Sequence, residues 1–579
     1  MPSRLGRYGT AGMILLCSLL FLFAEGSLAP DSAPRLIQES TRPKDRAACL
    51  ILARLNSDLE DHPQSREIHL LQRFYLARNG RPAWFNRQGV GLAAHQLLDT
   101  LEKSDAEGLP SRRYEPAALH ALLALPVVDD LPYFGWPPTQ IAEVDYALSR
   151  AFFRYAGDNL WGQERSWKSR GDWHRRPRSV DPSQLLELAL DLDALPSALR
   201  GVVPAAPGYR QLRRALERYR IIASRGGWNR IAEGAALHPG ESDPRVSALR
   251  KRLASEGDLS DPNAAVDDAE LFDPALTQAL RHFQTRHGLE SDGALGPGTL
   301  AALNVPVAER IAQLVRNLER WRWEGDTEAI VRINLADFSL AVNDGETRFE
   351  MPVVIGQRQH PTPLFSSQLQ ALVFSPYWYV PPSLLSRTLP RIVADPSYLK
   401  RNHYEVLDST GNPLRLNRAL GRQWQQGELE AALRQQPGPW NPMGNVKFLL
   451  PNPWAIYLHD TPEKDLFSRS RRAFSSGCIR LSQPQRLATW LLEREAYSAA
   501  QIDAYRSAGT PRLIGLKQPV DLQIGYWTAW VDDREQVHFS ADIYGRDSRL
   551  ARELRQRPAE TTLARLDLST PAQTASIPH

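Results

Sequence analysis

The sequence predicts a multidomain α+β protein with a helical first half and a β-rich second half. Its 579 residues suffice for roughly four domains at about 150 residues each. Apolar residues recur at helical spacing through most of the chain before residue 325, whereas strand-length apolar or alternating segments dominate after it. A polar, helical stretch over residues 383–440 interrupts the β-rich part. We expect this stretch to be an inserted capping subdomain, or lid.

Composition narrows the class of protein. Apolar residues make up 42% of the chain, which is enough to build packed cores. Lys plus Arg number 70 and Asp plus Glu 66, so the formal net charge is only +4. Nucleic-acid binders concentrate positive charge, and this balance argues against such a partner.

The first 29 residues have the pattern of a secretory signal peptide. Arg4 and Arg7 precede an uncharged apolar run over residues 11–24, and small residues follow up to Ala29. The run is shorter than the roughly 20 residues that span a bilayer comfortably. We therefore expect secretion to the periplasm, with an uncleaved membrane anchor as the alternative.

Residues 34–240 are expected to form a helical scaffold domain. Ile141, Val144, Leu148 and Phe152 recur at helical spacing in one long segment. No cluster of chemically reactive side chains precedes residue 240. The sequence therefore assigns this half a structural role.

Residues 241–305 predict a module of three short helices, followed by a linker helix in residues 306–328. Asp243 and Asp273 each precede a proline at a helix start, and Gly288 is suited to end the second helix. A glycine-rich turn then leads into the third helix.

Residues 329–516 are expected to form a β-rich domain that carries the insertion at 383–440. Residues 339–342 and 349–355 have strand patterns, with a hairpin turn at Asn343-Asp-Gly345. We expect residues 517–550 to form a C-terminal β extension and residues 551–579 to be a polar tail.

The candidate chemistry lies between Tyr457 and Leu481. Cys478 follows Ser475, Ser476 and Gly477, whose small side chains leave the backbone accessible. The amides of Ser476, Gly477 and Cys478 are therefore expected to point at a developing oxyanion. A thiol needs a lowered pKa or a base to act as a nucleophile at neutral pH.

His459, 19 residues before Cys478, is the candidate base. Either the side chain of Asp460 or a nearby backbone carbonyl would hold its other ring nitrogen. Three cysteines occur in the chain: Cys17, Cys49 and Cys478. Cys17 lies in the signal peptide, and a disulfide between the other two would silence the nucleophile. A Cys and a His at this spacing do not by themselves establish catalysis.

Longer motifs resemble two known families. The pattern His459-x-Thr461, then Ser475-x-Gly-Cys-Ile-Arg-Leu481, resembles the active-site signature of YkuD-type L,D-transpeptidase catalytic domains. The segment 243–304 resembles a peptidoglycan-binding module. The overall arrangement is similar to the large periplasmic, Gram-negative transpeptidases. The further motifs that carry these resemblances are Pro352-Val-Val-Ile-Gly356, Phe374-Ser-Pro-x-Trp378, Gly444-x-Val-Lys-Phe448, Phe283-Gln-x-Arg-His-Gly-Leu289 and Asp292-Gly-x-x-Gly296.

The resemblance implies a reaction. Cys478 would attack the carbonyl that joins the third residue of a tetrapeptide stem to its terminal D-alanine, and His459 would protonate the departing amine. A diaminopimelate amine of a second stem would then resolve the thioester into a 3→3 cross-link used in cell-wall biogenesis and cell shape. Residues 241–305 would bind glycan strands. No cofactor or metal is implied, and carbapenems would acylate Cys478.

The resemblance also implies roles for neighbouring residues. Arg480 would clamp a substrate carboxylate, or else form a structural ion pair. Tyr457 and Trp378 would line the substrate channel, with core packing the alternative for Trp378. Many relatives carry a second histidine where this chain has Ser476. That difference affects assistance to the oxyanion or substrate, and leaves the base at position 459.

Two other functions stay open at this stage. The chain could be a catalytically silent scaffold that only grips peptidoglycan, or a hydrolase resembling an L,D-carboxypeptidase in which water resolves the thioester. The joint presence of Cys478, His459, Gly477 and Arg480 favours catalysis. Acceptor preference, including lipoproteins and free D-amino acids, and the oligomeric state are not determined by the sequence.

Overall fold

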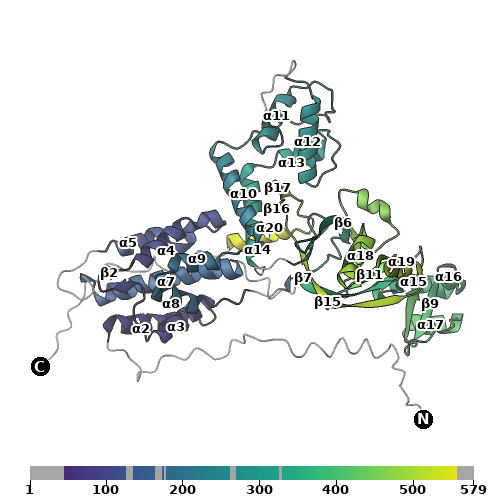
Figure 1. The fold of residues 1–579 in the computed structure, drawn as a ribbon, viewed down its shortest axis with the longest axis horizontal. Helices are drawn as coiled ribbons and strands as arrows, with labels where there is room; N and C mark the ends of the chain where they lie inside the picture. Colours follow the sequence, from purple (N-terminus) through teal and green to yellow (C-terminus); the bar gives the residue numbers. More distant parts are fainter. Residues whose placement is uncertain are drawn as a thin grey trace, which may run out of the picture. The chain divides into compact units, whose positions relative to one another are not determined.

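A computed structural model describes residues 45–125, 135–163, 173–174, 178–260, 269–324 and 329–556. The predicted signal peptide and all but the first residues of the predicted tail lie outside these ranges. The chain divides into two compact units. One contains Ala329–Tyr526, and the other contains Ser32–Glu328 together with Trp527–His579 (Figure 1). The predicted multidomain α+β class is confirmed. No helix among the described residues is long and apolar enough to cross a membrane.

The scaffold is built around one central helix, α7 (Pro138–Trp161), whose residues are almost all buried. Helices α2, α3, α4, α5, α8 and α9 pack against it (Figure 1). These helices are α2 (Arg46–Asp61), α3 (Arg66–Ala77), α4 (Leu92–Glu102), α5 (Pro116–Leu123), α8 (Pro182–Asp191) and α9 (Leu195–Val202), and the short strands of this part are β1 (Phe85–Asn86), β2 (Gly89–Val90) and β3 (Trp173–His174). Short 3-10 turns, η2 (Ser104–Glu107) and η3 (Ser111–Tyr114), connect them.

The three-helix module has the predicted helices, α11 (Arg245–Ser255), α12 (Pro274–Arg286) and α13 (Pro297–Leu303). Asp273 caps α12 by accepting a hydrogen bond from the Leu276 amide at 2.8 Å. Asp243 instead lies one residue before the N-cap of α11, where it accepts a hydrogen bond from the Arg245 amide at 2.8 Å.

The predicted linker helix is part of a core rather than a linker. α14 (Val307–Arg322) packs along α10 (Pro207–Ser224), and Leu314, Leu318 and Trp321 are buried there. The same core includes residues of β16 (Ala529–Val531) and β17 (Val537–Phe539). The apolar stripe of α14 is continuous, so it needs a packing partner along its whole length.

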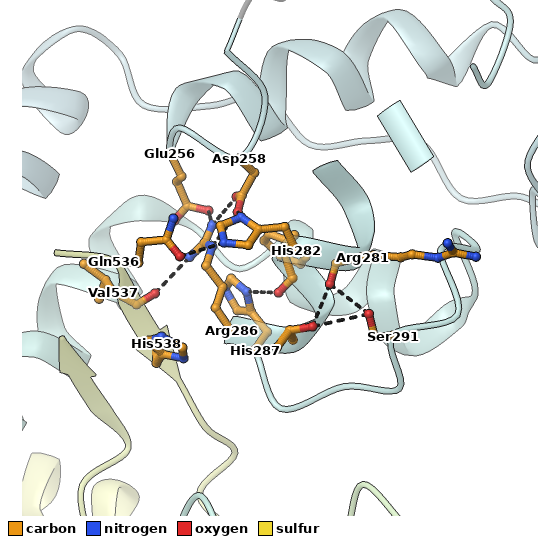
Figure 2. Close-up of polar contacts among 12 residues, drawn as sticks. Glu256, Asp258, Arg281, His282, Arg286, His287, Ser291, Gln536, Val537 and His538 are labelled. Atoms are coloured by element: carbon orange, nitrogen blue, oxygen red, sulfur yellow. Dashed lines mark hydrogen bonds and ion pairs between the residues drawn. The ribbon is translucent and has the colours of Figure 1, made fainter. Parts of the chain in front are cut away.

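A buried polar network ties the three-helix module to β17. Arg286 of α12 donates hydrogen bonds to Asp258 (Nε, 2.7 Å), to Glu256 (2.7 Å) and to the carbonyl of Val537 (3.2 Å) (Figure 2). His282 on the same helix contacts Asp258 at 2.8 Å through Nδ1 and Gln536 at 2.6 Å through Nε2. Arg286 therefore pairs with two buried carboxylates and also binds the backbone of β17.

The β-rich unit is a mixed sheet that closes on itself. Its strands follow one another in the order β11-β12-β14-β6-β5-β4-β15-β7, and β11 also pairs with β7. The short β13 pairs with β6. The strand bounds are β4 (Val331–Asn334), β5 (Ser339–Asn343), β6 (Arg348–Gly356), β7 (Leu364–Phe374), β11 (Val446–Leu449), β12 (Leu458–His459), β13 (Ala473–Ser475), β14 (Ile479–Leu481) and β15 (Arg512–Gly525). The predicted hairpin at Asn343-Asp-Gly345 joins β5 to β6, which pair antiparallel.

Two elements on the C-terminal side cross the boundaries expected at residues 516 and 551. β15 continues past residue 516 to Gly525, because residues 522–525 pair with β4 and complete the sheet. The beginning of the expected tail belongs to a helix, α20 (Arg546–Gln556). Its Asp547 accepts a hydrogen bond from the buried Arg320 of α14, and the two form an ion pair. The charged composition of this segment gives no indication of that pair.

The insertion forms a small cap with its own core, which we define as residues 378–435. One side of a sheet in the order β8-β10-β9 is covered by helices (Figure 1). The elements are β8 (Trp378–Tyr379), α15 (Pro382–Ala394), α16 (Ser397–Arg401), β9 (Tyr404–Asp408), α17 (Arg418–Gln426) and β10 (Ala431–Gln435). Elsewhere in this unit, α18 (Pro484–Arg494) contacts β11, and α19 (Ala499–Ser507) follows α18.

Candidate active site

Three neighbouring strands place the candidate catalytic residues on one face of the sheet. Lys447 on β11 pairs with His459 on β12, and His459 pairs with Arg480 on β14. Residues in register on adjacent strands point to the same face, with strands about 4.8 Å apart. The opposite face is apolar and buried, as Phe448 and Leu458 show.

Cys478 lies beside this row of three residues, Lys447, His459 and Arg480. β12 and β14 run parallel with Leu458 opposite Ile479, so the preceding residues, Tyr457 and Cys478, are also neighbours. The Ile479 amide donates to the Tyr457 carbonyl at 3.0 Å and holds this end of the pairing. Cys478 and His459 are therefore diagonal neighbours on adjacent strands, on the same face.

His459 is oriented by a backbone carbonyl. Its Nδ1 donates to the carbonyl oxygen of Asp460 at 2.5 Å, which leaves Nε2 as the nitrogen that can accept a proton. Burial is the main cause that lowers the pKa of His459 to about 4. The hydrogen bond to the Asp460 backbone acts in the raising direction, and the cations Arg480 and Lys447 contribute to the lowering. The imidazole is therefore neutral at neutral pH.

The carboxylate of Asp460 does not contact the imidazole. It accepts hydrogen bonds from the amides of Asn445 (2.8 Å) and Thr461 (2.7 Å) and pairs with Lys464. Of the two acceptors that the sequence left open, the carbonyl is the one in place. The side chain instead fixes the loops on either side of His459.

The thiol of Cys478 is free and neutral at rest. Burial raises its pKa, while the Tyr457 backbone, Lys447 and Arg480 act in the opposite direction with smaller effects. Its Sγ lies 3.8 Å from the carbonyl oxygen of Ala455, a weak hydrogen bond. Because the thiol does not ionise spontaneously near neutral pH, it requires a base.

The turn before Cys478 is held by buried hydroxyl groups. Ser475 Oγ donates to the Cys478 carbonyl at 2.6 Å, and Thr362 Oγ1 donates to the Gly477 carbonyl at 2.8 Å while accepting from the Gly356 amide at 3.0 Å. Gly477 has φ = 121°, a conformation that side chains rarely adopt. The turn therefore needs glycine at this position.

The expectation for the Gly477 amide is wrong. It donates to Ser475 Oγ at 3.1 Å and so is not directed at an oxyanion. The amides of Ser476, which is exposed, and of Cys478 remain as candidate oxyanion donors. The local cause is the hydroxyl of Ser475, which folds back on the turn.

Two further predicted site residues, Arg480 and Trp378, are engaged by other parts of the chain. Arg480 forms an ion pair with Glu463, with Nη1 to Oε2 at 2.5 Å, on the loop that follows His459. Trp378 packs against the core of the cap, whereas the next residue, Tyr379, is exposed. Core packing, the alternative that the sequence left open for Trp378, is therefore the arrangement in the structure.

Sequence reasoning did not single out Lys447, Thr362 or Glu463 as site residues. A signal for Lys447 existed: it is a lone charge in the apolar run Val446–Leu450, which the alternation of a strand places on the face away from the core. Thr362 also carried a signal, because the pair Thr362-Pro363 after Pro352-Val-Val-Ile-Gly356 is part of the transpeptidase resemblance. Glu463 carried none, since its partner Arg480 is brought to it only by folding.

The cap is joined to this site by a short strap, residues 436–445. Asn441 is fully buried and donates from its side chain to the carbonyls of Pro376 (2.9 Å) and Gln436 (3.1 Å). The strap ends at Asn445, whose amide binds the Asp460 carboxylate. The base of the cap is thus linked, residue by residue, to the neighbour of His459.

Known proteins match this chain in three regions. Residues 328–514 match the family model of the L,D-transpeptidase catalytic domain, YkuD. Residues 242–303 match a model described as "Putative peptidoglycan binding domain", and residues 69–216 match a scaffold domain.

A curated relative from Haemophilus influenzae, named "Putative L,D-transpeptidase", is 30% identical over 242 residues. The match covers 41% of this chain and 48% of the relative, so it spans about half of that protein's length.

Proposed function

We propose that this chain, which carries an L,D-transpeptidase catalytic domain and a peptidoglycan-binding domain, cross-links peptidoglycan stem peptides through a thioester on Cys478. The observation that carries the proposal is the common sheet face on which the free thiol of Cys478 neighbours a neutral His459 with its Nε2 available as a base. Both groups lie in the part of the chain that matches the catalytic domain.

In the first half-reaction, His459 Nε2 takes the thiol proton as sulfur attacks the carbonyl carbon between the third stem residue and D-alanine. The amides of Ser476 and Cys478 stabilise the resulting oxyanion. As the C–N bond breaks, His459 returns the proton to the departing amine. The products are a thioester and D-alanine.

In the second half-reaction, a diaminopimelate amine of another stem attacks the thioester carbonyl. His459 removes a proton from that amine and delivers it to the departing sulfur, which regenerates the thiol and leaves a 3→3 amide bond. Water competes with the amine at this stage, so the site must exclude it. The cap, connected to the site through Asn441, is suited to that role.

The two domains indicate that the protein acts outside the cytoplasm, where peptidoglycan is assembled. We propose that residues 1–29 direct it to the periplasm and that residues 241–305 hold it on glycan strands. This binding would raise the local concentration of stem peptides at Cys478.

The test incubates the purified protein with disaccharide-tetrapeptide and follows the products by mass spectrometry. We expect cross-linked dimers from the wild type and none from Cys478→Ala. Release of D-alanine without dimers would assign a hydrolase instead, and no change in the substrate would leave only a peptidoglycan-binding scaffold. A carbapenem should add covalently to the wild type, and an adduct that persists in Cys478→Ala would exclude Cys478 as the reactive residue.

A further inference from the structure

Lys447 is a half-buried cation next to the candidate nucleophile that the proposed mechanism does not use. Its Nζ lies 3.4 Å from the centre of the Tyr457 ring, a cation–π contact. Within the part of the chain that the structure describes, no carboxylate forms an ion pair with it. A half-buried lysine is normally paired with an anionic group, so Lys447 can accept an anion from a ligand.

The position of Lys447 places this unpaired charge close to the reacting atoms. It pairs across the sheet with His459, and its side chain reaches Tyr457, the residue opposite Cys478. Burial lowers the pKa of Lys447 to about 8, and the nearby Cys478 raises it. The ammonium thus remains largely protonated at neutral pH and lies within electrostatic reach of the sulfur.

Arg480, the other cation of the row, is already engaged. Its guanidinium forms the 2.5 Å ion pair with Glu463, and its side chain is only 16% exposed. A substrate carboxylate would have to displace Glu463 to bind it. Of the two cations that flank His459, Lys447 is therefore the one that can accept an anion without breaking an existing pair.

We propose that Lys447, held by the Tyr457 ring, binds the terminal carboxylate of the acyl donor. This inference rests on the proposed function, in which the donor ends in a D-alanine whose carboxylate is three bonds from the carbonyl that Cys478 attacks. Binding of that carboxylate by Lys447 would place the scissile carbonyl over the thiol. The contact predicts that the donor needs a free terminal carboxylate. Arg480 then supports the loop that carries Glu463.

The experiment measures binding separately from turnover. In a Cys478→Ala background, the affinity for a tetrapeptide donor with a free terminal carboxylate is compared with that for the same donor as a terminal carboxamide. Calorimetry is then repeated with Lys447→Met and Lys447→Arg added. Lys517→Met is the matched control, because Lys517 is an exposed lysine on β15 of the same unit.

We expect Lys447→Met to weaken binding of the carboxylate donor about tenfold or more, the usual effect of losing a charge-assisted hydrogen bond. Binding of the carboxamide donor should stay unchanged, Lys447→Arg should retain part of the preference, and Lys517→Met all of it. Equal weakening for both donors, or no weakening for either, would overturn the assignment. Because binding is read without Cys478, an inactive wild type would refute the proposed function and leave this test valid.

Discussion

At the scale of single residues, the proposed catalytic pair of Cys478 and His459 is neutral at rest. Burial raises the pKa of the Cys478 thiol and lowers that of His459 to about 4, so a thiolate–imidazolium pair is not the ground state. The proton must therefore move as the substrate carbonyl is attacked, when the developing charge on oxygen is stabilised by backbone amides. The neighbouring cations Arg480 and Lys447 make His459 harder to protonate and Cys478 easier to ionise.

A pH dependence follows from this arrangement. His459 accepts a proton only when neutral, so acylation of Cys478 should be retained at pH 5 and lost as the pH falls through about 4. In Arg480→Gln a cation that lowers this pKa is gone, and the loss should begin at higher pH. Arg469→Gln is the control, because Arg469 is an exposed arginine on the loop that follows His459. The rate of acyl-enzyme formation by intact-mass spectrometry between pH 3.5 and 8 measures both, and an unmoved acid limb in Arg480→Gln would contradict the assigned cause.

At the scale of elements, the proposed nucleophile Cys478 depends on a turn between two short strands. The turn residues 476–478 join β13 to β14, and the carbonyl of Gly477 is held by Thr362, which lies after β6 in the chain. Thr362 is fully buried and also receives the amide of Gly356. One hydroxyl thus connects the end of β6 to the turn that carries Cys478.

Thr362→Val should remove the link between the end of β6 and the turn that carries Cys478. The substitution keeps the shape of the side chain but removes the hydrogen bonds of its hydroxyl with the Gly356 amide and the Gly477 carbonyl, at a cost of about 1–3 kcal/mol in stability. We expect a lower free energy of unfolding and slower acylation of Cys478, whereas Thr362→Ser should restore most of both. Denaturant titration together with acylation rates provides the test; a Val variant equal to wild type in both would refute the role.

At the scale of the whole molecule, the chain divides into two compact units. In the larger one, Arg286 joins the three-helix module to β17 by pairing with Glu256 and Asp258 and binding the Val537 carbonyl (Figure 2). The Arg286 guanidinium lowers the pKa of Glu256 well below its usual value, against the raising effect of burial. The three-helix module is therefore a part of this unit and not an independent domain.

Removal of that arginine should loosen the junction. Arg286→Met removes one of the two arginines that pair with buried Glu256, which keeps Arg252, and leaves buried Asp258 with His282 alone. Breaking a buried ion pair typically costs about 3–5 kcal/mol. Amide hydrogen exchange in residues 274–286 and 529–539 should accelerate, while exchange in α7 stays as in wild type. Arg281→Met, an exposed position on the same helix, should leave all three segments unchanged. Unaltered exchange at the junction in Arg286→Met would show that the network does not hold it.

Much of the fold could be predicted because it depends on local periodicity. The helices α11, α12 and α14, and the hairpin of β5 and β6, follow from apolar spacing and turn residues close in the sequence. The role of α14 could not be predicted, since an amphipathic stripe shows that a partner exists without naming it. The end of β15 was misplaced for the same reason: its last residues are a strand because β4 lies beside them.

The sequence by itself determined the broad class, the order of the domains, and the candidates Cys478 and His459, because periodicity and short motifs are written in neighbouring residues. Only the tertiary structure decided which carbonyl orients His459, that the Gly477 amide is occupied, that Arg480 is paired, and that Lys447 shares their face. The physical reason is that strand register and burial set hydrogen bonds and charge environments, and both arise between segments far apart in the chain.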